Sequence, residues 1–250
     1  MKQLIAFDLD GTLAESKQPI GAEMAALFKD LLDVAKVSVI SGGDWPQFDT
    51  QVAQRIPAGA KLENLFLMPT TGSKLYRFQD DAWTQIYAET FTREERQRIV
   101  AALDKAVKAC GFDKEKTWGQ QIEDRGSQIT FSALGQEAPL DAKKAWDPDI
   151  SKRKQLQAAL EGDLSDLSVK VGGSTSIDIT RQGIDKAYAI RRLSEHADVP
   201  EEAILFMGDA IYPGGNDDPV RAAGVDTVAV RDVQETGNVI RGIIACMKDK

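Results

Sequence analysis

KQLIAFDLDGT, residues 2–12, indicates the architecture of this 250-residue chain more directly than any other segment. Its residues 4–7 are all apolar and predict a short buried strand, which stops at Asp8 and Asp10. Because side chains alternate along an extended chain, both carboxylates project to the same side at the strand's carboxyl end. The alternative is an ordinary surface turn, since Asp and Gly are common turn residues.

Predicted strands and helices alternate along the chain after this segment. Further apolar runs predict buried strands at residues 37–40, 65–68, 203–207 and 225–230. Apolar residues at helical spacing predict helices at residues 21–34 and 45–56, after Gly183, and from about Gly237. Alternating strands and helices with short connections favour an α/β fold with a doubly wound parallel sheet, which binds ligands at the carboxyl ends of its strands.

The middle of the chain has a different order of elements. A helix, a pair of strands, a second helix and a second pair of strands are predicted at residues 92–110, 118–134, 149–160 and 168–180. We therefore expect a smaller α/β domain at residues 82–181, inserted into a core that consists of residues 1–81 and 182–250.

The composition argues against several classes of function. A net charge of −8 and a pI of about 4.9 disfavour general binding to nucleic acid or to an anionic membrane. Neither a long apolar run nor a signal-peptide pattern is found, so we expect a cytoplasmic protein. Cys110, Cys246 and His196 are the only cysteines and histidine, so a disulfide framework, a cysteine metal site and a histidine-based triad are not indicated. We expect His196, near the end of a helix, to be solvated.

Polar residues follow the predicted strands of the core. Those expected at one edge of the sheet are Asp8, Asp10, Ser41, Lys186, Asp209 and Asp217. Ser41 precedes Gly42 and Gly43, and a hydroxyl with nearby backbone N–H groups suits phosphate binding. The alternative for Lys186 is an ordinary water-exposed lysine at the start of a helix. For Asp209 and Asp217 it is a loop of caps and turns.

Crowded carboxylates repel one another unless a cation lies among them. Mg²⁺ fits best, because it favours carboxylate oxygens, water and substrate phosphate. We assign Asp8, the backbone carbonyl of Asp10, and Asp209 as its ligands.

The order D-x-D-G-T, S-G-G, D-K and G-D-x₇-D resembles the haloacid dehalogenase (HAD) phosphotransferase superfamily. The resemblance implies that Asp8 is a nucleophile that forms an aspartyl-phosphate and that Asp10 is the acid/base. It further implies that Lys186 neutralises phosphoryl oxygens, and that Asn216 and Asp217 support the metal ligands without binding the ion.

The inserted domain resembles the large α/β cap of one HAD branch (subfamily IIB), where the chain is most similar to the eukaryotic-type phosphomannomutases. The segments that carry the similarity are GGSTSID (172–178), GIDK (183–186), GD (208–209) and PGGND (213–217). The substrate-binding residues that the similarity implies are Gly42, Gly43, Arg125, Lys143, Ser176 and Asp178. Ser176 and Asp178 could hydrogen-bond sugar hydroxyls, and the alternative for both is the ordinary polar face of a strand.

Two departures separate this chain from the mutases. Gln136 and Lys143 stand where arginines are expected, and Ser41 precedes two glycines instead of following them. A hexose phosphomutase must hold a second phosphate with fixed cap cations, and Lys does not replace Arg in bidentate phosphate binding. We therefore expect a Mg²⁺-dependent phosphatase acting on sugar phosphates or similar small phosphomonoesters, with phosphomannomutase as the alternative. A non-catalytic binding protein on the same fold is the alternative of another class. The expected partner is a small phosphorylated substrate, and a homodimer is left open.

Overall fold

The computed structural model describes residues 1–248, and these form two compact units. One unit consists of Met1–Ala88 together with the chain from Ile184 onward, and the other consists of Glu89–Gly183. The second unit is therefore an insertion in the first, with one connection on each side.

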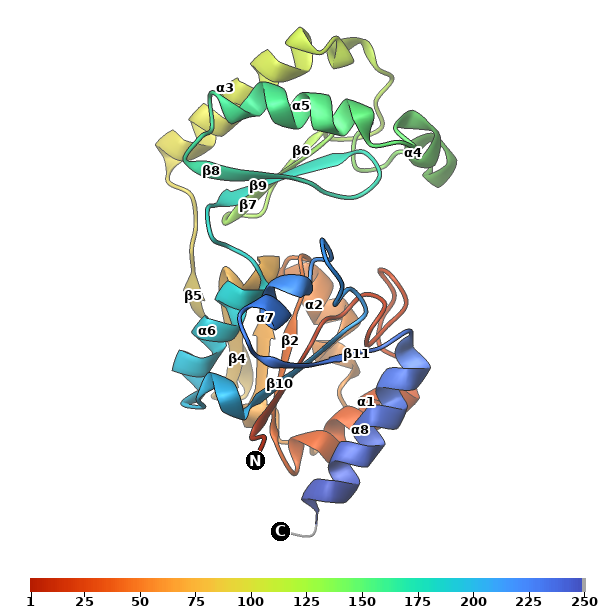
Figure 1. Ribbon diagram of the computed structural model, residues 1–250, viewed down its shortest axis with the longest axis vertical. Helices are drawn as coiled ribbons and strands as arrows, with labels where there is room; N and C mark the ends of the chain where they lie inside the picture. The colour runs from red at the N-terminus through yellow and green to blue at the C-terminus, as the bar shows by residue number, and fades with distance from the viewer. Residues whose placement is uncertain (249–250) are drawn as a thin grey trace. The chain divides into compact units, whose positions relative to one another are not determined.

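The first unit is built on a seven-stranded sheet with the order β11-β10-β1-β2-β3-β4-β5 (Figure 1). Its strands are β1 (Leu4–Phe7), β2 (Lys36–Ile40), β3 (Leu65–Met68), β4 (Lys74–Gln79), β5 (Ala82–Ala88), β10 (Ile204–Gly208) and β11 (Asp226–Ala229). The pairs among β11, β10, β1, β2 and β3 are all parallel, whereas β4 and β5 are antiparallel. The predicted parallel α/β sheet is confirmed.

Helices cover both faces of this sheet. They are α1 (Ala22–Leu32), α2 (Trp45–Gln51), α6 (Lys186–Ala197), α7 (Asp218–Ala222) and α8 (Val233–Met247), with 3₁₀ turns at η1 (Ala53–Arg55), η2 (Leu62–Asn64), η3 (Thr70–Gly72) and η5 (Glu201–Ala203). Strand β1 is fully buried, and its alternating side chains divide between two cores. Ile5 and Phe7 pack with α1 and α8, whereas Leu4 and Ala6 pack with α6. A strand buried on both faces is apolar at every position, as in a doubly wound fold.

The second unit has a four-stranded antiparallel sheet with the order β6-β7-β9-β8. Its elements are α3 (Arg93–Ala109), η4 (Phe112–Lys114), β6 (Ile122–Asp124), β7 (Gln128–Ser132), α4 (Leu140–Trp146), α5 (Ser151–Glu161), β8 (Leu167–Val171) and β9 (Ser176–Arg181). Ile129 and Ile177 belong to an apolar core shared with α3 and α5. Their neighbours in the strands are polar, so the other face of the sheet carries residues such as Thr130 and Asp178.

Two elements differ from the sequence-based expectation. Residues 74–88 form the β4–β5 hairpin, so the first unit continues through Ala88, past the expected boundary at residue 81. Helix α8 begins at Val233 and not at Gly237, because the Asp232 side chain accepts a hydrogen bond from the Glu235 N–H at 2.8 Å and caps the helix.

His196 also differs from expectation. It is half-buried and stacks on Tyr87 with 5.0 Å between ring centroids.

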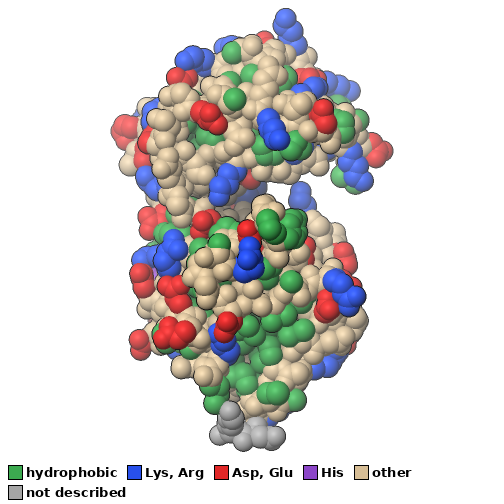
Figure 2. Space-filling model, viewed as in Figure 1, with side chains coloured by type: hydrophobic (Ala, Val, Ile, Leu, Met, Phe, Trp, Pro, Cys, Tyr) green, Lys and Arg blue, Asp and Glu red, His purple; other side chains and the backbone are tan. Residues whose placement is uncertain are grey.

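No helix among residues 1–248 combines the length and the apolar character needed to cross a membrane. On the face seen in Figure 2, basic and acidic side chains are intermixed, so this face offers no continuous basic surface to a phosphate backbone.

Candidate active site

Five strand ends and helix starts of the first unit carry the predicted site residues. Asp8 follows β1, Ser41 follows β2, and Asp209 follows β10. Lys186 is the first residue of α6, which Asp185 caps by accepting a hydrogen bond from the Tyr188 N–H at 2.8 Å. Asp217 lies directly before α7. Because β1, β2 and β10 are parallel neighbours, their carboxyl ends meet at one edge of the sheet.

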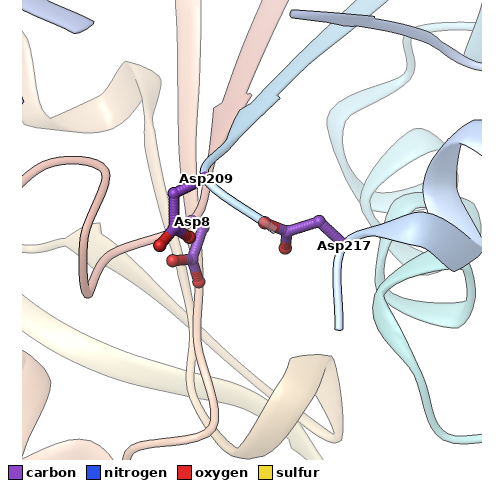
Figure 3. A group of neighbouring side chains, drawn as sticks. All are labelled: Asp8, Asp209 and Asp217. Carbon is purple, nitrogen blue, oxygen red and sulfur yellow. The ribbon is translucent and has the colours of Figure 1, made fainter. Parts of the chain in front are cut away.

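Three carboxylates gather at this edge. Oxygen atoms of Asp8, Asp209 and Asp217 lie within 4.8 Å of one another. Figure 3 shows the Asp8 and Asp209 side chains next to each other, with the Asp217 carboxylate turned toward them. Asp8 and Asp217 are buried, whereas Asp209 is exposed. The cluster therefore has a closed side and an open side.

Two glycines make room for this cluster. A Cβ at Gly11 would lie 2.3 Å from a carboxylate oxygen of Asp209, and one at Gly208 would lie 2.1 Å from a carboxylate oxygen of Asp217. Gly11 also has a φ of +87°, which favours glycine. These positions let two carboxylates approach the backbone closely. Three carboxylates held so closely are a set of hard oxygen donors, which fits a divalent cation such as Mg²⁺.

Lys186 lies between two of the carboxylates. Its ammonium group forms short ion pairs with Asp8 and Asp217, and its side chain is 2% exposed. The exposed-lysine alternative is therefore wrong. Burial alone would lower the pKa of Lys186, but the negative charges of Asp8 and Asp217 outweigh this effect and raise it. The lysine stays positively charged in a buried site.

The carboxyl groups respond to burial and to one another. Burial raises the pKa of Asp8 to about 6; the positive charge of Lys186 opposes the shift and the negative charge of Asp217 adds to it. Burial and then the charge of Asp217 raise the pKa of Asp209. Excess negative charge thus remains after Lys186 is counted, and a cation would relieve it.

Asp10 is held by the backbone that follows it. One carboxylate oxygen accepts a hydrogen bond from the Lys17 N–H at 2.6 Å. Its side chain is partly exposed, and its negative charge contributes to the raised pKa of Asp209. Its role as acid/base and the assignment of its carbonyl as a metal ligand both remain predictions.

The loop after β2, Ser41–Asp44, is held by hydrogen bonds and an ion pair that could not be predicted from the sequence. The Thr71 N–H donates to the Ser41 carbonyl at 2.9 Å, and the Thr70 N–H donates to the Gly43 carbonyl at 2.8 Å. Lys74, which is 7% exposed, forms an ion pair with Asp44 at 2.5 Å. A Cβ at Gly42 would lie 3.9 Å from the Thr71 hydroxyl oxygen. We call Ser41–Asp44 the Ser41 loop.

The second unit brings only some of its predicted residues together. Asp178 accepts a hydrogen bond from the Thr130 hydroxyl at 2.7 Å, and burial raises its pKa, a shift that this hydrogen bond opposes. Arg125 forms a bidentate ion pair with Glu123, at 3.0 and 2.8 Å, and its positive charge acts on Asp178. Ser176 lies at the start of the same strand as Asp178.

Lys143 of the second unit and Asn216 of the first were also predicted as site residues. Lys143 lies in helix α4 and not on the sheet, and its ammonium group donates a hydrogen bond to the Gln136 carbonyl at 2.8 Å. Asn216 is exposed in the loop directly before Asp217. A shared role with the clustered residues remains a prediction for both.

Comparisons with known proteins show which family this chain matches. Residues 5–212 match the haloacid dehalogenase-like hydrolase family. The chain is 25% identical to the phosphomannomutase of Schizosaccharomyces pombe over 231 residues, which cover 86% of this chain and 84% of that protein.

Two solved structures share the fold. A trehalose-6-phosphate phosphatase from Aspergillus fumigatus has a TM-score of 0.60 at 20% identity, with 100% of this chain and 93% of that chain covered. An IMP-bound IMP-nucleotidase from Plasmodium falciparum has a TM-score of 0.67 at 15% identity, with 98% and 68% covered.

Proposed function

We propose that this chain, which belongs to the haloacid dehalogenase-like hydrolase family, is a Mg²⁺-dependent phosphatase of sugar phosphates or similar small phosphomonoesters. The observation that carries the proposal is the buried pair of Asp8 and Lys186 within a cluster of three carboxylates. A buried carboxylate held beside a cation, with a second carboxylate outside the cluster, suits transfer of a phosphoryl group through an aspartyl-phosphate.

Asp8, the Asp10 carbonyl and Asp209 would hold Mg²⁺, and Asp217 and Asn216 would support them. The bound ion would supply positive charge for the phosphoryl oxygens. Asp217 already forms an ion pair with Lys186 and accepts a hydrogen bond from the Ala210 N–H at 3.1 Å, which is a supporting arrangement.

The proposed reaction has two steps, the formation and the hydrolysis of an aspartyl-phosphate, and side chains of this protein act in both. Asp8 attacks phosphorus and forms the aspartyl-phosphate, while the bond to the leaving oxygen breaks and Asp10 gives that oxygen a proton. A water molecule then attacks the phosphorus of the aspartyl-phosphate, gives its proton to Asp10, and releases orthophosphate and Asp8. Lys186 and the Ser41 hydroxyl hold the phosphoryl oxygens.

The contacts of the second unit support a phosphatase over a mutase. Arg125 is already paired with Glu123, and Lys143 is bound to a backbone carbonyl. Neither is left as a fixed, unpaired cation for a second phosphate, which a mutase needs. Phosphomannomutase remains the second candidate, because relatives about 25% identical over most of the chain carry that name.

An assay with two readouts separates the candidates. Purified protein with Mg²⁺ is given mannose 1-phosphate and a hexose bisphosphate activator, and orthophosphate and mannose 6-phosphate are both measured. Faster release of orthophosphate supports the phosphatase, and dominant isomerisation overturns it. A panel of phosphate esters with the same readout would identify the substrate class.

Mg²⁺ binding is expected to weaken as pH falls below about 6. Because the pKa of Asp8 is raised to about 6, the proton competes with the ion up to that pH. Affinity measured by titration calorimetry should fall about tenfold per pH unit below pH 6. Asp8→Asn, as the control, should bind more weakly at pH 7 and show a flatter profile. Equal wild-type affinity at pH 5 and 7 would refute the assignment of Asp8 as a ligand.

The same shift sets the sign of the stability change without metal. The folded protein binds the Asp8 proton more tightly than the unfolded chain, whose carboxyl has its ordinary pKa of 3.8. The resulting stabilisation is fully present below that value and is lost as pH rises through about 6.

We further propose a compartment and a partner for this chain. Cys110 and Cys246 are both free thiols, which suits the reducing cytoplasm. The proposed partner is a small phosphorylated substrate. A homodimer would be tested by light scattering.

A further inference from the structure

The turn η3 (Thr70–Gly72) has an unusual backbone. Thr70, Thr71 and Gly72 have φ values of 48°, 56° and 79°, so three successive residues are left-handed. Left-handed backbone is unfavourable for a β-branched residue such as threonine. Strained backbone persists where the surrounding structure holds it, and it is frequent near functional sites.

Two sides of the turn contact elements of the proposed active site. Its first two N–H groups donate to the carbonyls of Ser41 and Gly43, as described above. At Gly72, a Cβ would lie 2.3 Å from the Cβ of Ala189, so the turn packs directly on α6. Ala189 lies within one helical turn of Lys186. The turn therefore touches both the Ser41 loop and the helix that presents Lys186.

Tyr87 holds the third side of the turn. Its hydroxyl donates a hydrogen bond to the Gly72 carbonyl at 2.7 Å. The ring is itself held, with His196 stacked on it and the Arg192 guanidinium 4.6 Å from its centroid. Tyr87 lies in β5, one residue before the end of the first unit's initial segment at Ala88. A hydrogen-bonded path thus runs from Tyr87 through Gly72 and Thr71 to Ser41.

We propose that Tyr87 is a positioning residue for phosphate binding, which acts by holding the Gly72 peptide and, through η3, the Ser41 loop and α6. The inference rests on the proposed function, in which the Ser41 hydroxyl and Lys186 bind the phosphoryl group. Tyr87 touches neither of them. Small displacements of binding groups lower affinity and rate strongly, so a single hydroxyl can act at this distance.

Tyr87→Phe tests the proposal, because it removes the hydroxyl and keeps the ring in place beside His196 and Arg192. It also removes a side-chain hydrogen bond between Tyr87 and Arg192. Tyr76→Phe is the matched control: its hydroxyl donates to Gln85 at 2.8 Å in the same hairpin and not to η3. The substitution keeps the ring, which stacks on Trp45 directly after the Ser41 loop, so the control tests the loss of a hydroxyl close to the same loop. We expect Tyr87→Phe to bind inorganic phosphate, in the presence of Mg²⁺, about tenfold more weakly than wild type in titration calorimetry. Tyr76→Phe should bind as wild type does, and both variants should unfold at similar temperatures.

Hydrogen exchange gives a readout that needs no ligand. The Thr70 and Thr71 amides should exchange faster in Tyr87→Phe than in wild type, and unchanged in Tyr76→Phe. Unchanged phosphate affinity and exchange in Tyr87→Phe would overturn the proposal, as would equal losses in both variants. Failure of the wild type to bind phosphate would instead contradict the proposed function, and the exchange data would still decide whether Tyr87 holds the turn.

Discussion

Asp8→Asn is expected to lower kcat by a factor of at least about 10³, with little change in the fold. The amide has the shape of the carboxylate but cannot attack phosphorus to form the covalent intermediate. Lys186 keeps its ion pair with Asp217, so the buried ammonium group is not left alone. Burial disfavours the charge of Asp8, as its pKa of about 6 shows, so a neutral side chain is tolerated there.

Orthophosphate release and thermal unfolding are measured together for this variant. Asp33→Asn serves as the control, because Asp33 forms an exposed ion pair with Lys61 far from the site and its loss should change neither readout. An Asp8→Asn enzyme that retains activity within tenfold of wild type would disprove the assignment of Asp8 as nucleophile.

Lys186→Met is expected to impair both activity and stability. Methionine fills a similar volume but leaves Asp8 and Asp217 without their shared cation in a buried site. Breaking a buried ion pair by removing one partner costs about 3–5 kcal/mol. Loss of a fixed positive charge from a transition state lowers kcat by about 10²–10³. The expected result is a folded, less stable protein with very low turnover.

A second substitution separates the two effects. In the double variant Lys186→Met with Asp217→Asn, one uncompensated charge is removed, so part of the stability should return while turnover stays low. Lys105→Met is the control for a lysine in an ion pair, because the Lys105 side chain is 73% exposed and its loss should have little effect. Wild-type stability of Lys186→Met in chemical denaturation would contradict the buried network.

The sequence predicted the parts of the site that follow from strand ends. An apolar run followed by Asp8 or Asp209 places each carboxylate at a known edge of a parallel sheet, so their meeting could be expected. The sequence places Lys186 at the start of a helix. Its burial between two carboxylates could not be predicted, because Asp8 and Asp217 approach it only in the folded chain.

Contacts of the hairpin could not be predicted in the same way. Lys74–Gln79 carries Lys, Tyr and Arg among its apolar residues, so neither a continuous nor a clearly alternating pattern marks the strand. Its turn uses Asp80 and Asp81 with φ values of 50° and 59°, where Asn-Gly or Asp-Gly would be a clearer signal. Tyr87 and the Lys74–Asp44 pair act through this hairpin and were missed with it.

Two other features, the start of helix α8 and the Glu123–Arg125 ion pair, could have been predicted from sequence patterns. Asp232 with Glu235 three residues later is a helix-start pattern, and it marks the true beginning of α8. Arg125 lies two residues after Glu123, the last residue of a predicted strand, so an extended backbone there would put both side chains on one face, where they can pair.

The central pairing of β1 with β10 has a consequence for biosynthesis. Leu4 pairs with Ile204, so β1 meets one of its two neighbours only after all of the chain between them has been translated. Until then the nascent chain carries β1 with an open hydrogen-bonding edge, and such edges invite association with other chains. Ribosome-bound intermediates that end before residue 204 should therefore depend on chaperones more than the finished protein does.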